Sequence, residues 1–243
     1  MLGRVAADVR LRAAIGGLLA LAGLQAGCTA RDAGAPAGAS ESAAEGSTVR
    51  YVALGDSYTI GTSLVGAERW PNQLVERLPQ LELVGNPAVN GYTSLDLIEE
   101  ELPQLDAMRP ELVSLLIGVN DVVQRVPDSQ YAGNVAVILE ELLIRLPPGR
   151  IVCVAIPDYT VTPSGEAFGD PAQQSDAIVR ANAIMREACE SRQIPFVPEI
   201  YEISQAARDD PSLVADDGLH PSGAQYRLWV DVIVPVVEEL IRG

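Results

Sequence analysis

The stretch Val52–Gly61, which reads V-A-L-G-D-S-Y-T-I-G, decides how the rest of the chain is interpreted. An apolar run with a β-branched residue breaks at Gly55, presents Ser57 at the break and resumes at Ile60. This pattern predicts a strand ending in a glycine turn, which would expose the serine hydroxyl at the sheet edge where open α/β folds bind ligands. Gly, Asp and Ser are also ordinary turn residues, so the stretch alone favours a simple strand-to-helix turn.

Working outward from this stretch, apolar runs alternate with amphipathic segments along the chain. Strands are predicted at 49–54, 81–84, 112–117, 151–156 and 194–197. Helices are predicted at 71–77, from Thr93 or Ser94 to 105, at 130–146, 173–190 and 200–207, and in a last segment to 241 with a kink or break at Pro235. The alternation predicts an α/β fold, a three-layer α/β/α sandwich around a central, mostly parallel five-stranded sheet.

Composition limits the classes of partner. The 243 residues are 48% hydrophobic, enough for one α/β domain over 49–243 with a sizeable core. The formal charge is −16, and all 17 basic residues are arginine. Without a basic patch to neutralise phosphates, we expect no nucleic-acid partner.

The N-terminus has the pattern of an export signal. Three arginines precede an apolar run over 13–24, which is too short to span a bilayer comfortably, and small residues follow. We therefore interpret residues 1–27 as an export signal. The ending Gln25-Ala26-Gly27-Cys28 resembles the lipobox of bacterial lipoproteins, although Gln25 stands where that pattern usually has an aliphatic residue. The resemblance implies lipidation of Cys28 and an exported, membrane-anchored protein facing the periplasm or cell surface; the alternative is a plainly cleaved, secreted protein.

Residues 28–48 are mostly Ala, Gly and Ser with a few acids and no periodicity. Such a segment cannot bury a core, so we predict a flexible tether with a reach of roughly 25 Å. Of the remaining cysteines, Cys153 and Cys189 form an even pair that an exported protein could oxidise to a disulfide. The alternative is two buried free thiols, since one lies in an apolar run and the other on an apolar helix face.

Loops that follow the predicted strands carry an unusual set of polar groups: Ser57, Asn90 beside Gly91, and Asn120. Because the strands are parallel, we expect these groups to converge at one sheet edge. His220, the only histidine, lies three residues after Asp217 in D-G-L-H-P. This spacing lets the carboxylate hold one ring nitrogen and leaves the other free, as a general base requires. A solvated loop acid and an incidental histidine are the alternative interpretation.

The order Gly55-Asp56-Ser57, then Gly91, then Gly118-Val119-Asn120-Asp121, then Asp217-x-x-His220 resembles the SGNH (GDSL-type) esterase/lipase superfamily. The resemblance covers nearly the whole domain and implies its flavodoxin-like fold. It also implies roles for individual residues. Ser57 would be the nucleophile, His220 the general base and then acid, and Asp217 the group that orients His220.

By the same resemblance, the oxyanion hole would consist of the backbone N–H groups of Ser57 and Gly91 and the side-chain amide of Asn120. Preorganised donors of this kind are what ester hydrolysis through an acyl-enzyme needs. We expect Asp56 and Asp121 to cap the turns that follow them. The motif here reads G-D-S-Y, so Tyr58 replaces the usual leucine, and we expect it to affect packing or pocket shape.

The resemblance implies a serine ester hydrolase acting on carboxylic esters or thioesters, of the lysophospholipase, thioesterase or esterase type. One alternative is a carbohydrate O-acetyl esterase with the same mechanism, and another is an inactive binding lipoprotein with this fold. Loops 62–69 and 158–173 are expected to set the substrate class. We expect no cofactor and no metal site, since a single histidine and no clustered ligands leave none. The expected partners are an acyl ester, small or lipid, and a membrane reached through the lipid anchor; the chain is expected to be a monomer.

Overall fold

A computed structural model describes residues 48–242. The predicted export signal, Cys28 and the tether up to residue 47 lie outside these residues. A single five-stranded sheet runs through the described part in the order β2-β1-β3-β4-β5, and every pair of neighbouring strands is parallel. The strands are β1 (Val49–Gly55), β2 (Leu81–Gly85), β3 (Leu112–Leu116), β4 (Ile151–Val154) and β5 (Phe196–Val197). The predicted fold class is confirmed.

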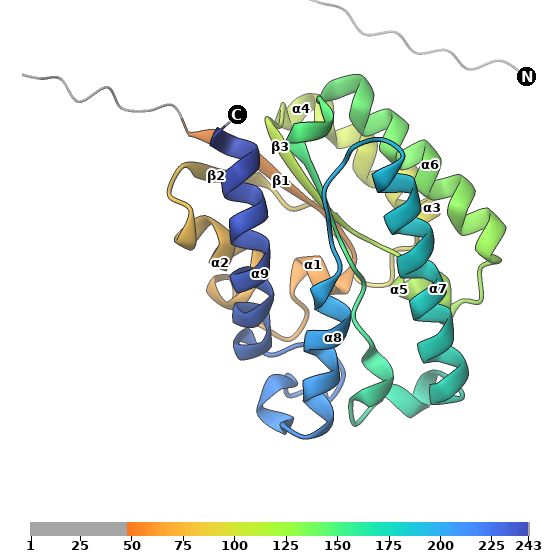
Figure 1. Cartoon of the computed structure of the whole chain (residues 1–243). Helices are drawn as coiled ribbons and strands as arrows, with labels where there is room; N and C mark the ends of the chain where they lie inside the picture. Colours follow the sequence, from red (N-terminus) through yellow and green to blue (C-terminus); the bar gives the residue numbers. More distant parts are fainter. Residues whose placement is uncertain (1–47, 243) are drawn as a thin grey trace, which may run out of the picture. The chain divides into compact units, whose positions relative to one another are not determined.

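Helices cover both faces of the sheet, as Figure 1 shows, with α2 and α9 on one side and α6 and α7 on the other. The helices are α1 (Ser57–Ile60), α2 (Trp70–Arg77), α3 (Ser94–Asp96), α4 (Leu105–Met108), α5 (Val119–Val123), α6 (Asp128–Arg145), α7 (Pro171–Glu190), α8 (Glu199–Gln205) and α9 (Gly223–Arg242). Burial of strand side chains from both faces explains why β1, β3 and β4 read as continuous apolar runs. None of these helices is long and apolar enough to cross a membrane.

The single helix predicted from residue 94 to 105 is wrong. After α3 the chain forms a π-helical turn (Leu97–Glu101), a 3-10 turn (Leu102–Gln104) and then α4. Pro103 explains the break, because it has no N–H and its ring clashes with the preceding turn of a regular helix. The irregular segment turns the side chain of Glu101 into the protein, where it is fully buried.

Two further expectations need correction. Of the kink or break expected at Pro235, the break is absent: helix α9 continues through this residue, which lies on its exposed side, while Trp229, Ile233 and Val237 on the other side are buried. Pro235 removes one helical hydrogen bond, and the buried face holds the helix in place. Strand β5 is shorter than predicted, because Pro195 has no N–H to give to a sheet ladder.

Cys153 and Cys189 are both buried free thiols in the structure. The structure therefore has the alternative of two buried free thiols, and the possible disulfide is not formed. Cys153 lies on β4 and Cys189 on α7, which packs over the sheet. The thiols are close enough that a hydrogen bond between them, together with burial, raises the pKa of Cys153 well above its ordinary value.

Candidate active site

The turn after β1 is built so that Ser57 is the first residue of α1. Gly55 has a φ of 153°, and a Cβ added there would lie 2.3 Å from the Leu116 carbonyl oxygen and 2.3 Å from Thr59 Oγ1. Only glycine fits this position. Asp56 then caps α1, since its carboxylate accepts the Tyr58 N–H at 3.0 Å. The strand and the capped turn hold Ser57 at the carboxyl end of β1.

Ser57, His220 and Asp217 meet at this edge although 163 residues separate the serine from the histidine. His220 Nε2 lies 2.9 Å from Ser57 Oγ, and His220 Nδ1 lies 2.6 Å from Asp217 Oδ2. The Ser57 and His220 residues are buried, with 7% and 9% of their surfaces exposed. A hydroxyl, an imidazole and a carboxylate joined in this order form the arrangement that activates a serine for nucleophilic attack.

Asp217 is held as an anion. Burial acts to raise its pKa, but hydrogen bonds from Ser63 and from the backbone and ring of His220 outweigh burial, and the pKa of Asp217 lies well below its usual range. The carboxylate therefore carries its negative charge at neutral pH. This fixes the proton of neutral His220 on Nδ1 and leaves Nε2 free to accept a proton from the serine.

Gly91 and Asn120 line the cavity beside Ser57. Asn120 follows Gly118 on α5, and its amide nitrogen donates to the Tyr92 carbonyl at 2.9 Å, which fixes the orientation of the amide. Gly91 has a φ of 86°, in the left-handed region. Within residues 48–242, no hydrogen bond uses the backbone N–H of Ser57 or Gly91. The structure therefore brings together the predicted oxyanion-hole residues, with two free backbone donors.

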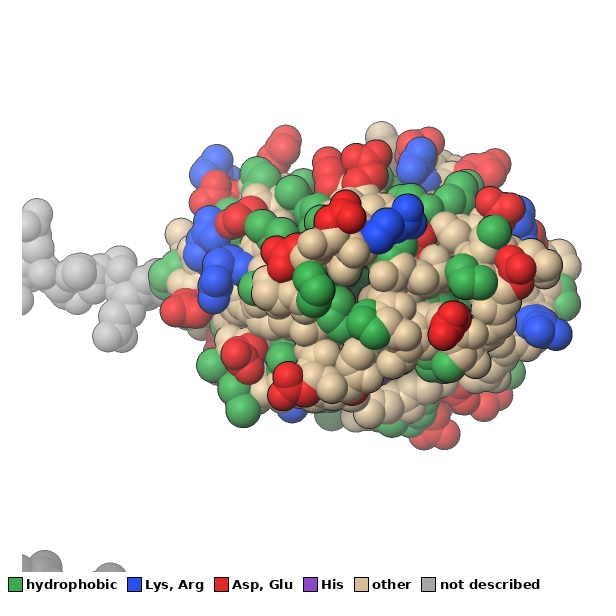
Figure 2. All heavy atoms as spheres, turned by 90° about the horizontal axis from the view of Figure 1, so that it is seen from below, with side chains coloured by type: hydrophobic (Ala, Val, Ile, Leu, Met, Phe, Trp, Pro, Cys, Tyr) green, Lys and Arg blue, Asp and Glu red, His purple; other side chains and the backbone are tan. Residues whose placement is uncertain are grey.

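The cavity at the triad has a volume of about 170 Å³. Besides Ser57, His220, Gly91 and Asn120, its lining is largely apolar and comprises Tyr58, Asn90, Val119, Val123, Tyr159, Phe168 and Leu219. Figure 2 views the molecule from the end toward which the strands run: hydrophobic side chains lie side by side near the middle of this face, and acidic and arginine side chains surround them. The cavity offers an apolar surface next to a polar reacting centre.

The two loops expected to set the substrate class contribute differently. Loop 158–173 supplies Tyr159 and Phe168, whose rings meet edge to face with centroids 5.7 Å apart. The loop is fixed by buried Asp158, which accepts hydrogen bonds from Ser175 and Gln205. Loop 62–69 does not line the cavity, but it places a serine against the triad acid.

Tyr58 behaves as expected. Its ring lies against His220, with centroids 5.0 Å apart, and its side chain is buried in the wall of the cavity. It therefore limits the space beside the imidazole without offering a group to the reaction. The Tyr226 hydroxyl donates to the Tyr58 carbonyl at 2.8 Å and ties α9 to this turn.

Three buried carboxyl groups lie behind the nucleophile. Burial raises the pKa of Asp56 to about 7 and that of Glu101 to about 8, and it also raises the pKa of Asp121. Glu101 accepts the Gly55 N–H at 3.0 Å, while its other oxygen has no hydrogen-bond partner among the described residues. No pattern in the sequence distinguishes Glu101 from the acids beside it. Asp56 caps the turn that follows it, as predicted, but Asp121 does not: it accepts the N–H and hydroxyl of Ser94 at the start of α3.

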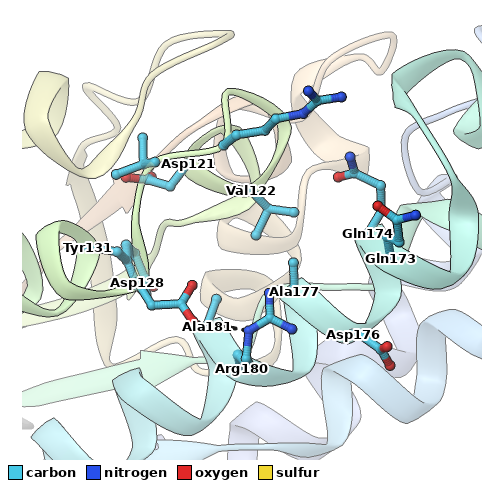
Figure 3. Close-up of a pocket in the computed structure, with 12 residues that line it drawn as sticks. Asp121, Val122, Asp128, Tyr131, Gln173, Gln174, Asp176, Ala177, Arg180 and Ala181 are labelled. Atoms are coloured by element: carbon cyan, nitrogen blue, oxygen red, sulfur yellow. Dashed lines mark hydrogen bonds and ion pairs between the residues drawn. The ribbon is translucent and has the colours of Figure 1, made fainter.

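A larger cavity, about 400 Å³, lies between α5, the start of α6 and α7 (Figure 3). Its lining is polar, and Figure 3 shows Arg180 paired with Asp128, with Nε and Oδ2 3.0 Å apart. It contains no member of the triad. Across residues 48–242, no group of three or more His, Cys, Asp or Glu side chains is arranged to hold a metal ion.

Comparisons with known proteins agree with this geometry. Residues 53–228 match the GDSL-like lipase/acylhydrolase family. An arylesterase from Vibrio mimicus is 26% identical over 208 residues, which cover 83% of this chain and 92% of that protein.

Solved structures share the fold. A lipolytic protein of the G-D-S-L family from Veillonella parvula superposes with a TM-score of 0.63 at 14% identity, covering 77% of this chain and 97% of that one. An acetylxylan esterase from Geobacillus stearothermophilus superposes with a TM-score of 0.61 at 19% identity, covering 79% of this chain and 95% of that one.

Proposed function

The chain belongs to the GDSL-like lipase/acylhydrolase family and is an ester-hydrolysing enzyme, and from this premise we propose that it hydrolyses carboxylic esters of short acyl chains through an acyl-enzyme on Ser57. The observation that carries the proposal is the unbroken series of contacts from Ser57 Oγ through His220 to Asp217, at 2.9 and 2.6 Å. These distances lie within hydrogen-bond reach, as a nucleophile and its base require.

In the proposed mechanism, Ser57 Oγ attacks the ester carbonyl carbon while its proton passes to His220 Nε2. The negative charge that develops on the carbonyl oxygen is met by the N–H groups of Ser57 and Gly91 and by the Asn120 amide. Each such donor contributes about 10²–10³ in rate in other hydrolases. His220 then gives the proton to the departing alkoxide, which leaves the acyl group on the serine.

Deacylation repeats the sequence with water. His220 Nε2 takes a proton from the water as its oxygen attacks the acyl carbonyl, and it returns that proton to Ser57 Oγ when the carboxylic acid leaves. Asp217 remains ionised throughout, because hydrogen bonds keep its pKa low, and it stabilises the imidazolium that forms in each half of the reaction.

The short acyl chain is inferred from the cavity. Its volume of about 170 Å³ lies below the roughly 300–1,000 Å³ of pockets that enclose drug-sized ligands. Phe168 and Tyr159 limit the cavity on the side of loop 158–173, and we propose that a longer acyl chain would meet them there. The V. mimicus relative is called an arylesterase, and the largely apolar lining of the cavity would also suit an ester of an aromatic alcohol.

The test is hydrolysis of p-nitrophenyl esters from acetate to palmitate by the wild type, by Ser57→Ala and by the control Ser191→Ala, whose serine is exposed at the end of α7. We expect kcat/KM to be highest between acetate and butyrate. Ser57→Ala should lose activity on the order of 10⁴-fold or more, and Ser191→Ala should match the wild type. A preference for long chains would instead favour a lipid or thioester substrate, and activity on acetate alone a sugar O-acetyl ester.

Retention of wild-type turnover by Ser57→Ala would show that Ser57 is not the nucleophile. Absence of turnover on every ester of the series would favour the inactive binding protein.

We also propose that the enzyme is exported and held at a membrane by lipid on Cys28. The lipobox-like ending of the N-terminal apolar run supports this proposal.

A further inference from the structure

Ser63 lies in the loop after α1 and has an unusual backbone conformation. Its φ is 67°, in the left-handed region that L-residues other than glycine, asparagine and aspartate rarely adopt. Serine has no intrinsic preference for this region. A strained residue of this kind persists where its surroundings fix it, and such residues cluster at functional sites.

The Ser63 side chain contacts the acid of the triad. Ser63 Oγ donates to Asp217 Oδ2 at 2.7 Å, and the same oxygen lies 2.6 Å from His220 Nδ1. Asp217 Oδ1 accepts the backbone N–H groups of Leu219 and His220, each at 2.9 Å. Four donors thus surround the carboxylate. Three belong to its own loop, and Ser63 is the one that reaches it from a distant part of the chain.

The turn that carries Ser63 is also tied to the nucleophile. The N–H groups of Gly61 and Thr62 both donate to the Ser57 carbonyl oxygen, at 3.0 and 3.1 Å. The contacts therefore close a ring, which runs from Ser57 through His220 and Asp217 to Ser63 and back along the turn to Ser57. A displacement of the Asp217 carboxylate must break a bond in this ring.

The electrostatics agree with this geometry. Burial acts to raise the pKa of Asp217, and the hydrogen bond from Ser63 is the largest of the effects that lower it. The hydroxyl thus adds to the stability of the carboxylate as an anion, in addition to fixing where its oxygens lie.

We propose that Ser63 is a positioning residue of the esterase, which holds the Asp217 carboxylate in the orientation where Oδ2 receives the His220 ring N–H. This inference rests on the proposed function, because it assigns Ser63 to the same reaction. Without the hydroxyl, the carboxylate loses the one hydrogen bond that reaches it from outside its own loop, and the constraint that keeps the imidazole proton on Nδ1 is weakened. A misplacement of catalytic groups by about 1 Å lowers rates by about 10²-fold.

A merely structural role for Ser63 would be to stabilise its loop. Two substitutions separate the two roles. Ser63→Gly removes the hydroxyl but suits the left-handed backbone, so the loop should keep or gain stability. Ser63→Asn also suits this backbone, and its side-chain amide brings an N–H donor to the place of the hydroxyl. Ser191→Ala is the matched control.

The experiment measures kcat and KM on the best p-nitrophenyl ester, the melting temperature, and the ring-nitrogen NMR spectrum of protein with ¹⁵N-labelled histidine. Since His220 is the only histidine, the ring signals report on this residue alone. We expect Ser63→Gly to lower kcat by about ten- to a hundredfold with KM changed less than about threefold, to keep its melting temperature, and to lose part of its Nδ1–H tautomer. We expect Ser63→Asn to recover kcat to within about tenfold of wild type and to restore the tautomer.

Wild-type kcat and an unchanged tautomer in Ser63→Gly would overturn the inference. So would a loss of kcat in Ser63→Gly that Ser63→Asn does not recover in part, because the hydrogen bond would then not be the cause. The NMR measurement needs no substrate. If the wild type hydrolysed none of the esters, the proposed function would fail, while the tautomer of His220 in the two variants would still decide whether Ser63 positions the Asp217–His220 pair.

Discussion

Glu101→Gln should become increasingly more stable than the wild type as the pH rises. Burial raises the pKa of Glu101 from its ordinary value of 4.5 to about 8, so the folded protein keeps this proton at neutral pH while the unfolded chain releases it. The hydrogen bond from Gly55 opposes this effect, and the nearby Asp56 adds to it. Between pH 4.5 and about pH 8 the unfolded chain binds fewer protons than the folded protein, so the stability of the wild type must fall as the pH increases.

The magnitude follows from the same values. Stability is unaffected by this group below pH 4.5, falls progressively up to pH 8 and is constant above it. Across the 2.5 pH units from 5.5 to 8, at about 1.36 kcal/mol per unit, the free energy of unfolding falls by about 3 kcal/mol. Glutamine has the shape of the protonated acid and keeps an oxygen for the Gly55 N–H at 3.0 Å, but it does not titrate.

Urea unfolding at several pH values tests this expectation, with the fluorescence of the buried Trp70 and Trp229 as the signal. The stability of Glu101→Gln relative to the wild type should grow by about 3 kcal/mol between pH 5.5 and 8. Glu76→Gln, at an exposed position on α2, should follow the wild type throughout. Equal pH dependence of Glu101→Gln and the wild type would show that the buried carboxyl is ionised in the folded protein, and the reasoning would be refuted.

Two further predictions concern the substrate and the location. Phe168→Ala should open the cavity and raise the ratio of octanoate to acetate hydrolysis by about tenfold, as measured on p-nitrophenyl esters. The control Val179→Ala, on the exposed side of α7, should leave this ratio unchanged. An unchanged ratio in both variants would show that Phe168 does not limit the chain length. Cys28→Ser should move the full chain from the membrane fraction of producing cells to the soluble exported fraction and abolish labelling by a fatty acid, and a chain that stays on the membrane unlabelled would contradict lipidation.

The sheet could be predicted because its strands are buried on both faces and therefore appear as continuous apolar runs. The site could be predicted because parallel strands deliver their loops to one edge, so that Ser57 and Asn120 must converge although they are far apart in sequence. The D-x-x-H spacing then identified Asp217 and His220. Each of these inferences depends on local sequence together with a single topological rule.

The residues that the sequence did not identify depend on long-range packing. Glu101 is the last acid of the run Glu99–Glu101, and only the π-helical turn decides that it alone points inward. Ser63 is one of several polar residues in a loop, and its partner is 154 residues away. Pro103 gave a signal for the helix break that could have been used, whereas Ser63 gave none in the sequence.

The carboxyl groups of the site have different pKa values because their environments differ. Asp217, partly exposed and surrounded by four donors, stays charged, whereas burial raises the pKa of Asp56 and Glu101 to about 7 and about 8. In the proposed mechanism, a carboxylate charge behind Ser57 would repel the oxyanion formed beside the serine, because charges interact strongly in a buried, low-dielectric site. The proton retained on Glu101 at neutral pH would lower that repulsion, while the full charge on Asp217, on the far side of the imidazole, would stabilise the cation proposed to form on His220. Environments that drive the pKa values of like groups apart are how one site assigns them different roles.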